Sequence, residues 1–124
     1  MGNWAVDLRL IAPWLDELDG ETAACVRNAL EALQDRGPRT GRPLVDSVQG
    51  SAFKNMKELR PPSPGRSEIR ILFAFDPSRK AVMLLAGDKS VGGTRERWSR
   101  WYARAIPRAD RLYRSYLKEL EDAK

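Results

Sequence analysis

The sequence predicts a single α+β domain over residues 1–124. Three strand-like segments, residues 53–60, 68–76 and 80–88, follow one another closely, which is typical of an antiparallel meander. Segments with helical periodicity flank them, two before the strands and a long one after. A chain of 124 residues suits one domain with one core, because at this size folding buries roughly two-thirds of the surface.

The N-terminal part is predicted to form a strand and two helices. Residues 3–10 alternate polar and apolar side chains, which indicates a half-buried strand. Pro13 suits the first turn of a short helix. Asp19 is placed to cap the next helix, over residues 21–36. The Gly-Pro pair at 37–38 ends that helix, because the glycine adopts a left-handed conformation and the proline cannot continue the helix.

The strongest strand signals lie in the middle of the chain. In residues 68–76, Ile69 and Ile71 share one face with two phenylalanines, whereas Arg70 lies on the other face. Residues 80–88 are almost continuously apolar, which predicts a central strand covered on both faces. Residues 44–48 form a weaker candidate strand.

A long amphipathic helix is predicted at the C-terminus. Gly92–Gly93 interrupts the chain before it, and Thr94 can cap it. Pro107 must kink this helix or split it in two. Its apolar stripe consists of Trp98, Trp101, Tyr102, Ala105, Ala109, Leu112, Tyr113, Tyr116 and Leu120, and we expect it to belong to the core. The opposite face is basic.

The charge is unevenly distributed. Residues 1–38 hold three basic and seven acidic side chains, whereas residues 39–124 hold 19 basic and 10 acidic ones. Sixteen of the 22 basic residues are arginine, whose planar guanidinium suits phosphate groups. A basic surface of this kind indicates a polyanionic or acidic partner, although it is equally compatible with a merely soluble basic protein.

Several classes of site are excluded by composition. The chain has no histidine, which removes a Ser-His-Asp triad and an ordinary zinc site. Cys25 is the single cysteine, so we expect a buried structural thiol and a reducing, cytoplasmic environment. No nucleotide-binding glycine motif or carboxylate metal cage occurs, so no cofactor and no metal are expected. The sequence also predicts neither a secretion signal nor a membrane span.

Three basic residues stand at or near the ends of predicted strands, namely Arg60, Arg70 and Lys89. If the meander pairs as predicted, they converge at one end of the sheet. Cleavage of RNA by its own 2′-hydroxyl needs stabilisation of the charged phosphorane, which arginines supply, and proton transfer, which a lysine crowded by arginines can supply. Glu58 and Tyr102 are further candidate proton carriers.

Each candidate also has a purely structural interpretation. Arg70 can pair with Glu58 or Glu68 across the sheet, and Lys89 can be an ordinary solvated residue at a strand end. The candidate RNA-binding residues, which lie near the three basic residues in sequence or carry a ring on which a base can stack, are Lys54, Lys57, Arg66 and Tyr102.

The order of these segments resembles the RelE/HigB family of toxins from bacterial type II toxin–antitoxin systems. The resemblance covers nearly the whole chain and rests on four segments: MKELR at 56–60, EIRILFAFD at 68–76, VMLLAGDKS at 82–90 and RWSRWYARAIPRADRLY at 97–113. It implies a RelE-like fold, with an antiparallel sheet packed against two N-terminal helices and a C-terminal helix kinked near Pro107.

The resemblance also implies a function. Such a toxin is a ribosome-dependent, metal-independent mRNA endonuclease that inhibits translation, with Arg60, Arg70 and Lys89 as its catalytic residues. By resemblance, Arg60 binds phosphate, Arg70 stabilises the transition state, and Lys89 transfers a proton or binds phosphate. The alternatives are a ParE-like inhibitor of DNA gyrase on the same fold and a non-catalytic basic module that binds nucleic acid or protein.

The resemblance further implies a cognate antitoxin, often a helix-turn-helix protein, with which the toxin can form a hetero-oligomer. The exposed arginines of the last helix are the candidate antitoxin-binding residues, namely Arg100, Arg104, Arg108 and Arg111. This chain departs from many HigB-like toxins at Asp88-Lys89-Ser90, where those have paired lysines, and it lacks the C-terminal histidine of some relatives.

Overall fold

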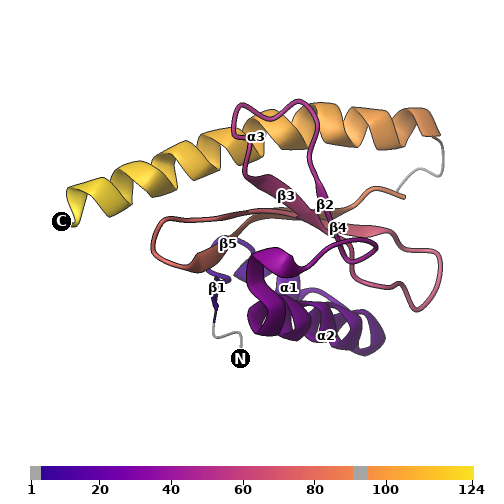
Figure 1. Ribbon diagram of the computed structural model, residues 1–124. Helices are drawn as coiled ribbons and strands as arrows, with labels where there is room; N and C mark the ends of the chain where they lie inside the picture. Colours follow the sequence, from indigo (N-terminus) through magenta and orange to yellow (C-terminus); the bar gives the residue numbers. More distant parts are fainter. Residues whose placement is uncertain (1–3, 91–94) are drawn as a thin grey trace.

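The computed structural model describes the backbone of residues 4–90 and 95–124, and the side chains of residues 4–90 and 98–124. It confirms the α+β class, with a five-stranded sheet between two helical layers (Figure 1). The elements in chain order are β1 (Ala5–Asp7), α1 (Ala12–Asp16), α2 (Gly20–Arg36), the 3-10 turn η1 (Gly37–Arg39), β2 (Val45–Ser47), β3 (Met56–Leu59), β4 (Ile69–Phe75), β5 (Lys80–Asp88) and α3 (Arg95–Asp122). The predicted glycine break and Thr94 cap lie outside the described residues.

The strand order in the sheet is β1-β5-β4-β3-β2. Strands β2 to β5 pair antiparallel, which confirms the predicted meander, although β3 begins at Met56 and not at residue 53 as predicted. Strand β1 is the exception, because it pairs parallel to β5, with Val6 opposite Ala81. A parallel pair needs a long crossover, and α1 and α2 supply part of the connection between these two strands.

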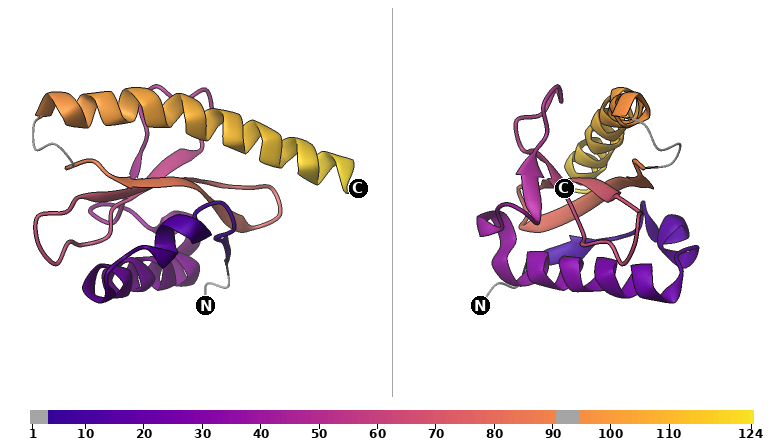
Figure 2. Two further views of the ribbon diagram at one scale, coloured as in Figure 1. Left: turned by 180° about the vertical axis from the view of Figure 1, so that it is seen from behind. Right: turned by 90° about the vertical axis from the view of Figure 1, so that its right-hand side faces the viewer.

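The sheet separates two apolar cores. Helices α1 and α2 cover one face, and α3 crosses the other (Figure 2). Strand β4 shows the division most clearly: Ile71 and Phe73 belong to the core beneath α2, whereas Leu72 and Ala74 belong to the core beneath α3. The predicted alternation in this strand is therefore confirmed, and β5 is covered on both faces as expected.

Local hydrogen bonds and one glycine determine where the N-terminal elements begin and end. Strand β1 is shorter than predicted, because the Asp7 carboxylate accepts the backbone N–H of Arg9 at 3.0 Å and turns the chain. Asp19 caps α2 as predicted, accepting the N–H of Thr22 at 2.8 Å. Gly37 ends α2 with a φ of 59°, and a Cβ there would lie 2.4 Å from the Trp4 ring, so this position requires glycine.

Helix α3 runs without interruption from Arg95 to Asp122, so Pro107 does not split it. Proline is tolerated here on the exposed side of the helix, and the helix bends along its length (Figure 1). Ala105, Ala109, Tyr113 and Tyr116 are buried against the sheet, as the apolar stripe predicts. Within the described residues, no helix has the length and apolar character that a membrane span would need.

Candidate functional site

A groove of about 660 Å³ opens between the β2 edge of the sheet and the N-terminal half of α3. Strands β2 and β3, the segments beside them, the residue after β5 and one side of α3 all contribute to it. Its lining residues are Arg42, Asp46, Ser47, Val48, Gln49, Glu58, Arg60, Lys89, Tyr102 and Ile106. Four of the residues singled out in the sequence are among them, namely Glu58, Arg60, Lys89 and Tyr102.

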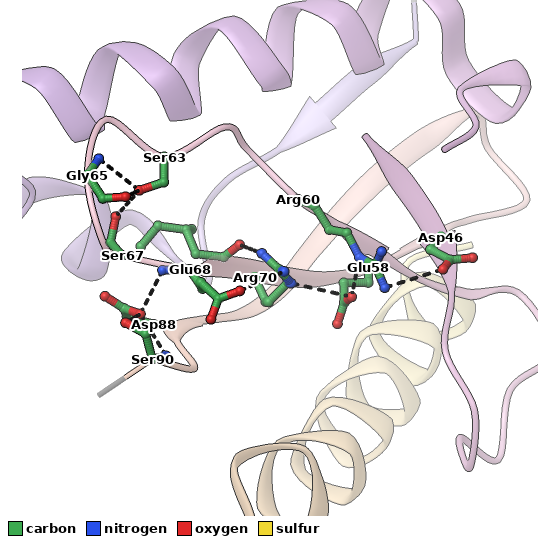
Figure 3. Close-up of polar contacts among 11 residues, drawn as sticks. Asp46, Glu58, Arg60, Ser63, Gly65, Ser67, Glu68, Arg70, Asp88 and Ser90 are labelled. Atoms are coloured by element: carbon green, nitrogen blue, oxygen red, sulfur yellow. Dashed lines mark hydrogen bonds and ion pairs between the residues drawn. The ribbon is translucent and has the colours of Figure 1, made fainter. Parts of the chain in front are cut away.

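Glu58 forms the centre of the charged part of the groove (Figure 3). Because side chains alternate between the two faces of a strand, Glu58 lies on the same face of β3 as Met56, the face toward α3. Its side chain is only 4% exposed. Its Oε1 accepts a hydrogen bond from Arg60 Nε at 2.8 Å and lies 3.6 Å from Arg70 Nε. Arg60 also reaches Asp46 on β2, with Nη2 3.3 Å from the carboxylate.

Arg70 lies behind this pair and is mostly buried, with 13% of its side chain exposed. It pairs at longer range with Glu68, at 3.7 Å, and donates from Nη1 to the backbone carbonyl of Ile69 at 2.8 Å. Both pairings considered for Arg70 in the sequence, to Glu58 and to Glu68, therefore occur. Within the described residues, its Nε is buried without a hydrogen-bond partner. Because Arg70 is mostly buried and does not line the groove, it contributes positive charge to the site rather than a donor at the groove surface.

Lys89 follows the last residue of β5, and its backbone N–H donates to the Glu68 carbonyl at 3.1 Å. Its ammonium lies 5.1 Å from the centre of the Trp98 ring and 5.4 Å from that of Tyr102, in cation–π range. Burial lowers the pKa of Lys89, and the positive charge of Arg70 lowers it further. A lysine in this setting loses its proton more readily than a solvated one does.

Tyr102 contributes a phenol from the first turns of α3. Burial raises the pKa of Tyr102, and interaction with the Glu58 carboxylate raises it further. The hydroxyl therefore stays protonated at neutral pH and can donate a hydrogen bond. The structure thus brings Arg60, Arg70, Lys89 and Tyr102 together around Glu58, while their catalytic roles remain a prediction.

The other candidate RNA-binding residues lie elsewhere. Lys57 is adjacent to Glu58 on β3, so its side chain lies on the other face of the sheet, the one that α2 covers. Its ammonium donates a hydrogen bond to Ser47 Oγ at 3.3 Å. Arg66 lines a separate depression beside the N-terminus of α2, together with Gly65. Lys54 is exposed on the β2–β3 loop and does not line the groove. Proximity in sequence grouped these three residues with the site, but strand alternation separates at least Lys57 from it.

The candidate antitoxin-binding arginines are all exposed. They follow α3 at helical spacing and form one ridge, which consists of Arg100, Arg104, Arg108 and Arg111. Cys25, expected to be buried, is only partly buried on α2. Several groove residues were not predicted from the sequence, among them Asp46, Gln49 and Ile106.

The groove is chemically suited to a phosphodiester. Arg60 and Lys89 present cationic donors at its surface, and Arg70 adds a positive charge behind them. Glu58 offers a carboxylate that can accept a proton, and Tyr102 offers a hydroxyl that can donate a hydrogen bond. In the part of the chain that the structure describes, no group of three or more acidic, cysteine or histidine side chains is arranged to hold a metal ion.

Comparison with known proteins places this chain in a family. Residues 13–114 match the family described as "Phage derived protein Gp49-like (DUF891)". Two proteins of Mycobacterium tuberculosis (strain ATCC 25618 / H37Rv) are similar over much of the chain. The one named "Putative toxin HigB2" is 51% identical over 122 residues, which are 98% of this chain and 58% of that protein. The one named "Putative toxin HigB3" is 46% identical over 104 residues, which are 84% of each.

The chain thus spans less than two-thirds of the first relative, but most of the second. No solved structure matches the chain significantly. The family match and the similarity to these two relatives agree along most of the sequence. The chain belongs to the Gp49-like family of phage-derived proteins, and its relatives include proteins named as HigB toxins.

Proposed function

We propose that this protein is the toxin of a type II toxin–antitoxin system and an mRNA endonuclease that acts on the ribosome without a metal ion. The observation that carries the proposal is the convergence of Arg60, Lys89 and Tyr102 around the buried Glu58, with Arg70 behind it. Relatives named as HigB toxins support the toxin role.

The groove residues supply the parts of a 2′-hydroxyl attack. The Arg60 guanidinium binds the scissile phosphate, and Glu58 accepts the 2′-hydroxyl proton as the 2′-oxygen bonds to phosphorus. Arg70 holds Glu58 in place and adds positive charge beside the pentavalent phosphorane. Lys89 then donates a proton to the departing 5′-oxygen. The products are a 2′,3′-cyclic phosphate and a 5′-hydroxyl.

The mechanism needs no histidine because its proton carriers have suitable environments. The lowered pKa of Lys89, caused by burial and then by Arg70, makes its ammonium a better proton donor than a solvated lysine. Tyr102 keeps its proton, since burial and Glu58 raise its pKa, and it can hydrogen-bond a non-bridging phosphate oxygen.

The test is cleavage of a defined mRNA on purified ribosomes, with the 5′ ends mapped and the 3′ termini analysed for cyclic phosphate. Arg60→Ala is expected to slow cleavage by roughly 100- to 1,000-fold, the loss typical of a transition-state donor. Arg27→Ala, which removes an exposed arginine from α2, is the matched control and should cut normally. A wild-type protein that leaves the mRNA intact on ribosomes but inhibits gyrase supercoiling would replace this proposal with the ParE-like alternative.

We also assign the arginine ridge of α3 to the antitoxin. Four exposed guanidinium groups in one row suit an acidic segment of a partner protein. Replacing two of them together, Arg104→Glu with Arg108→Glu, should weaken co-purification with the antitoxin strongly, whereas Arg27→Glu should not. Unchanged affinity in the double variant would remove the ridge from the interface.

A further inference from the structure

The groove has a second wall that differs in chemistry from the first. The β2–β3 loop, residues 48–55, contributes Val48 and Gln49 to the lining, and α3 contributes Ile106. Val48 and Ile106 are half-buried, whereas Gln49 is exposed. This wall offers apolar surface and one amide but no charged side chain, so phosphate binding does not explain it.

A buried carboxylate of α3 fixes the loop in place. Asp110 is only 7% exposed, and it accepts hydrogen bonds from the Ser51 hydroxyl and, at 2.8 Å, from the backbone N–H of Ala52. The Ser51 oxygen in turn accepts the N–H of Phe53 at 3.0 Å. A buried carboxylate is costly unless it is well hydrogen-bonded, and here its oxygens bind a surface loop rather than the core.

Two more side chains of α3 hold the remainder of the loop. The Tyr113 ring packs edge-on against Phe53 at 4.9 Å, and its hydroxyl accepts the Asn55 amide at 3.2 Å. Arg114 lies over the Phe53 ring at 5.4 Å. Positions 110, 113 and 114 share one side of the helix, beside which the loop runs (Figure 1). The wall is therefore organised before any ligand binds.

We propose that this wall is a nucleobase-recognition subsite. In it, Val48 and Ile106 contact the face of one base, and the Gln49 amide reads its hydrogen-bonding edge. Asp110 is the positioning residue, because its hydrogen bonds to Ser51 and Ala52 hold the loop that carries Val48 and Gln49. The inference rests on the proposed function, since it requires a phosphate bound at Arg60 and Lys89.

The chemistry of single-stranded RNA favours this assignment. Proteins recognise unstacked bases through apolar or aromatic surfaces and through hydrogen bonds to base edges. A glutamine amide presents a donor and an acceptor side by side, and this pattern matches some base edges and not others. A base attached to the phosphate in the charged part of the groove would meet the uncharged part within the same pocket.

The test uses ribosomes programmed with mRNAs that differ in one base at the cleavage site. The measured quantity is the ratio of kcat/KM between the best and the worst base. Gln49→Ala is expected to reduce this ratio by roughly tenfold, the lower part of the range for a bidentate contact. Gln49→Glu, which replaces the amide donor with an acceptor, should change which base is preferred. Gln34→Ala, an exposed glutamine on α2, is the matched control and should keep the ratio.

Asp110→Asn tests the positioning role. If this variant folds poorly, Ser51→Ala replaces it, because it removes the hydrogen bond from the Ser51 hydroxyl to Asp110 and leaves the one from the Ala52 N–H. Both are expected to lower the base ratio. Loss of folded protein alone slows every substrate equally and leaves the ratio unchanged, so this readout separates positioning from a merely structural role. A ratio that stays at the wild-type value in Gln49→Ala overturns the inference and leaves the proposed function standing.

A wild-type protein that cuts no mRNA overturns the proposed function instead. The subsite is then measured by fluorescence anisotropy with short single-stranded RNAs that differ in one base. Discrimination that disappears in Gln49→Ala supports the subsite in that case as well. Equal binding of all four bases by the wild type overturns it.

Discussion

On the face of the sheet covered by α1 and α2, the strands present Leu59, Ile71 and Phe73, all of them fully buried. On the face covered by α3, Met56 and Leu72 are just as deeply buried, but Glu58 and Arg70 lie on the same strands beside them. The first face is an ordinary apolar core, and the second is apolar under the middle of α3 and charged toward its N-terminal end.

This difference between the two faces supports placing the candidate functional site on the face that α3 covers. A buried ion pair is a weak stabiliser, because the cost of removing two charges from water offsets their attraction, and a pair of apolar residues would serve a core as well. Glu58 and Arg70 could thus be replaced by apolar residues if packing were their only task. Glu58 lines the groove and Arg70 lies directly behind it, a position that function explains better than packing does.

The largest effect is expected from removing Glu58. The Arg70 side chain is only 13% exposed in the wild type, and in Glu58→Ala it loses its better-buried partner, so the free energy of unfolding should fall by about 3–5 kcal/mol. Urea unfolding measures this loss. Glu68→Ala, which removes the more exposed partner at 3.7 Å, is the control and should cost no more than about 1 kcal/mol. Equal effects of the two variants would show that solvent reaches Arg70 freely.

The opposite face should respond in stability but not in activity. Leu33 of α2 is fully buried beneath the sheet, so Leu33→Ala should lower the free energy of unfolding by about 2–5 kcal/mol. Because Leu33 lies across the sheet from the groove, cleavage per folded molecule should stay at the wild-type level. A tenfold fall in this specific activity would mean that the two faces are coupled.

A smaller loss is expected where α3 meets the sheet. A Cβ at Gly87 would lie 2.7 Å from Nε1 of Trp101, so Gly87→Ala should push the helix away and cost about 1–3 kcal/mol. Tryptophan fluorescence should shift as well, since Trp101 is displaced. Gly65→Ala is the matched control, because no atom of the described residues lies within 4 Å of its added Cβ. A Gly87→Ala variant as stable as the control would show that α3 adjusts without cost.

Local pattern was sufficient to predict most of the fold. The predicted range 80–88 matches β5, because a continuous apolar run has few alternatives to a central strand. Strand β1 was predicted too long, since the pattern up to Leu10 gave no sign that Asp7 would bind the N–H of Arg9. Leu10 is consequently 46% exposed rather than part of the strand.

The site was only partly predictable. Arg60, Arg70 and Lys89 converge as expected, because antiparallel pairing of adjacent strands follows from their order. The position of Lys57 outside the groove could have been predicted, since strand alternation alone puts it on the other face of the sheet from Glu58. Gln49 could not have been found, because Asp110 places its loop through a contact between residues 59 positions apart.

The subtlest effect concerns the proton of Lys89. Burial and then Arg70 lower its pKa in the folded state, so its ammonium form is lost at a lower pH than in the unfolded chain. Between those two pKa values the unfolded chain holds more protons, so stability should rise with pH there, while cleavage that needs the ammonium should fall. We therefore expect opposite trends in the Lys89 contribution to the unfolding free energy and in kcat/KM, over the alkaline range between the folded pKa of Lys89 and that of a lysine in the unfolded chain.

Substitution separates these two trends. Lys89→Arg keeps the positive charge but cannot lose its proton, so it should slow cleavage and remove the alkaline decline. Lys80→Arg, at the exposed start of β5, the strand that Lys89 follows, should leave the pH profile as it is. Persistence of the decline in Lys89→Arg would assign it to another group and would leave Lys89 as a phosphate ligand. In that case the proton donor of the proposed reaction would have to be sought elsewhere in the groove.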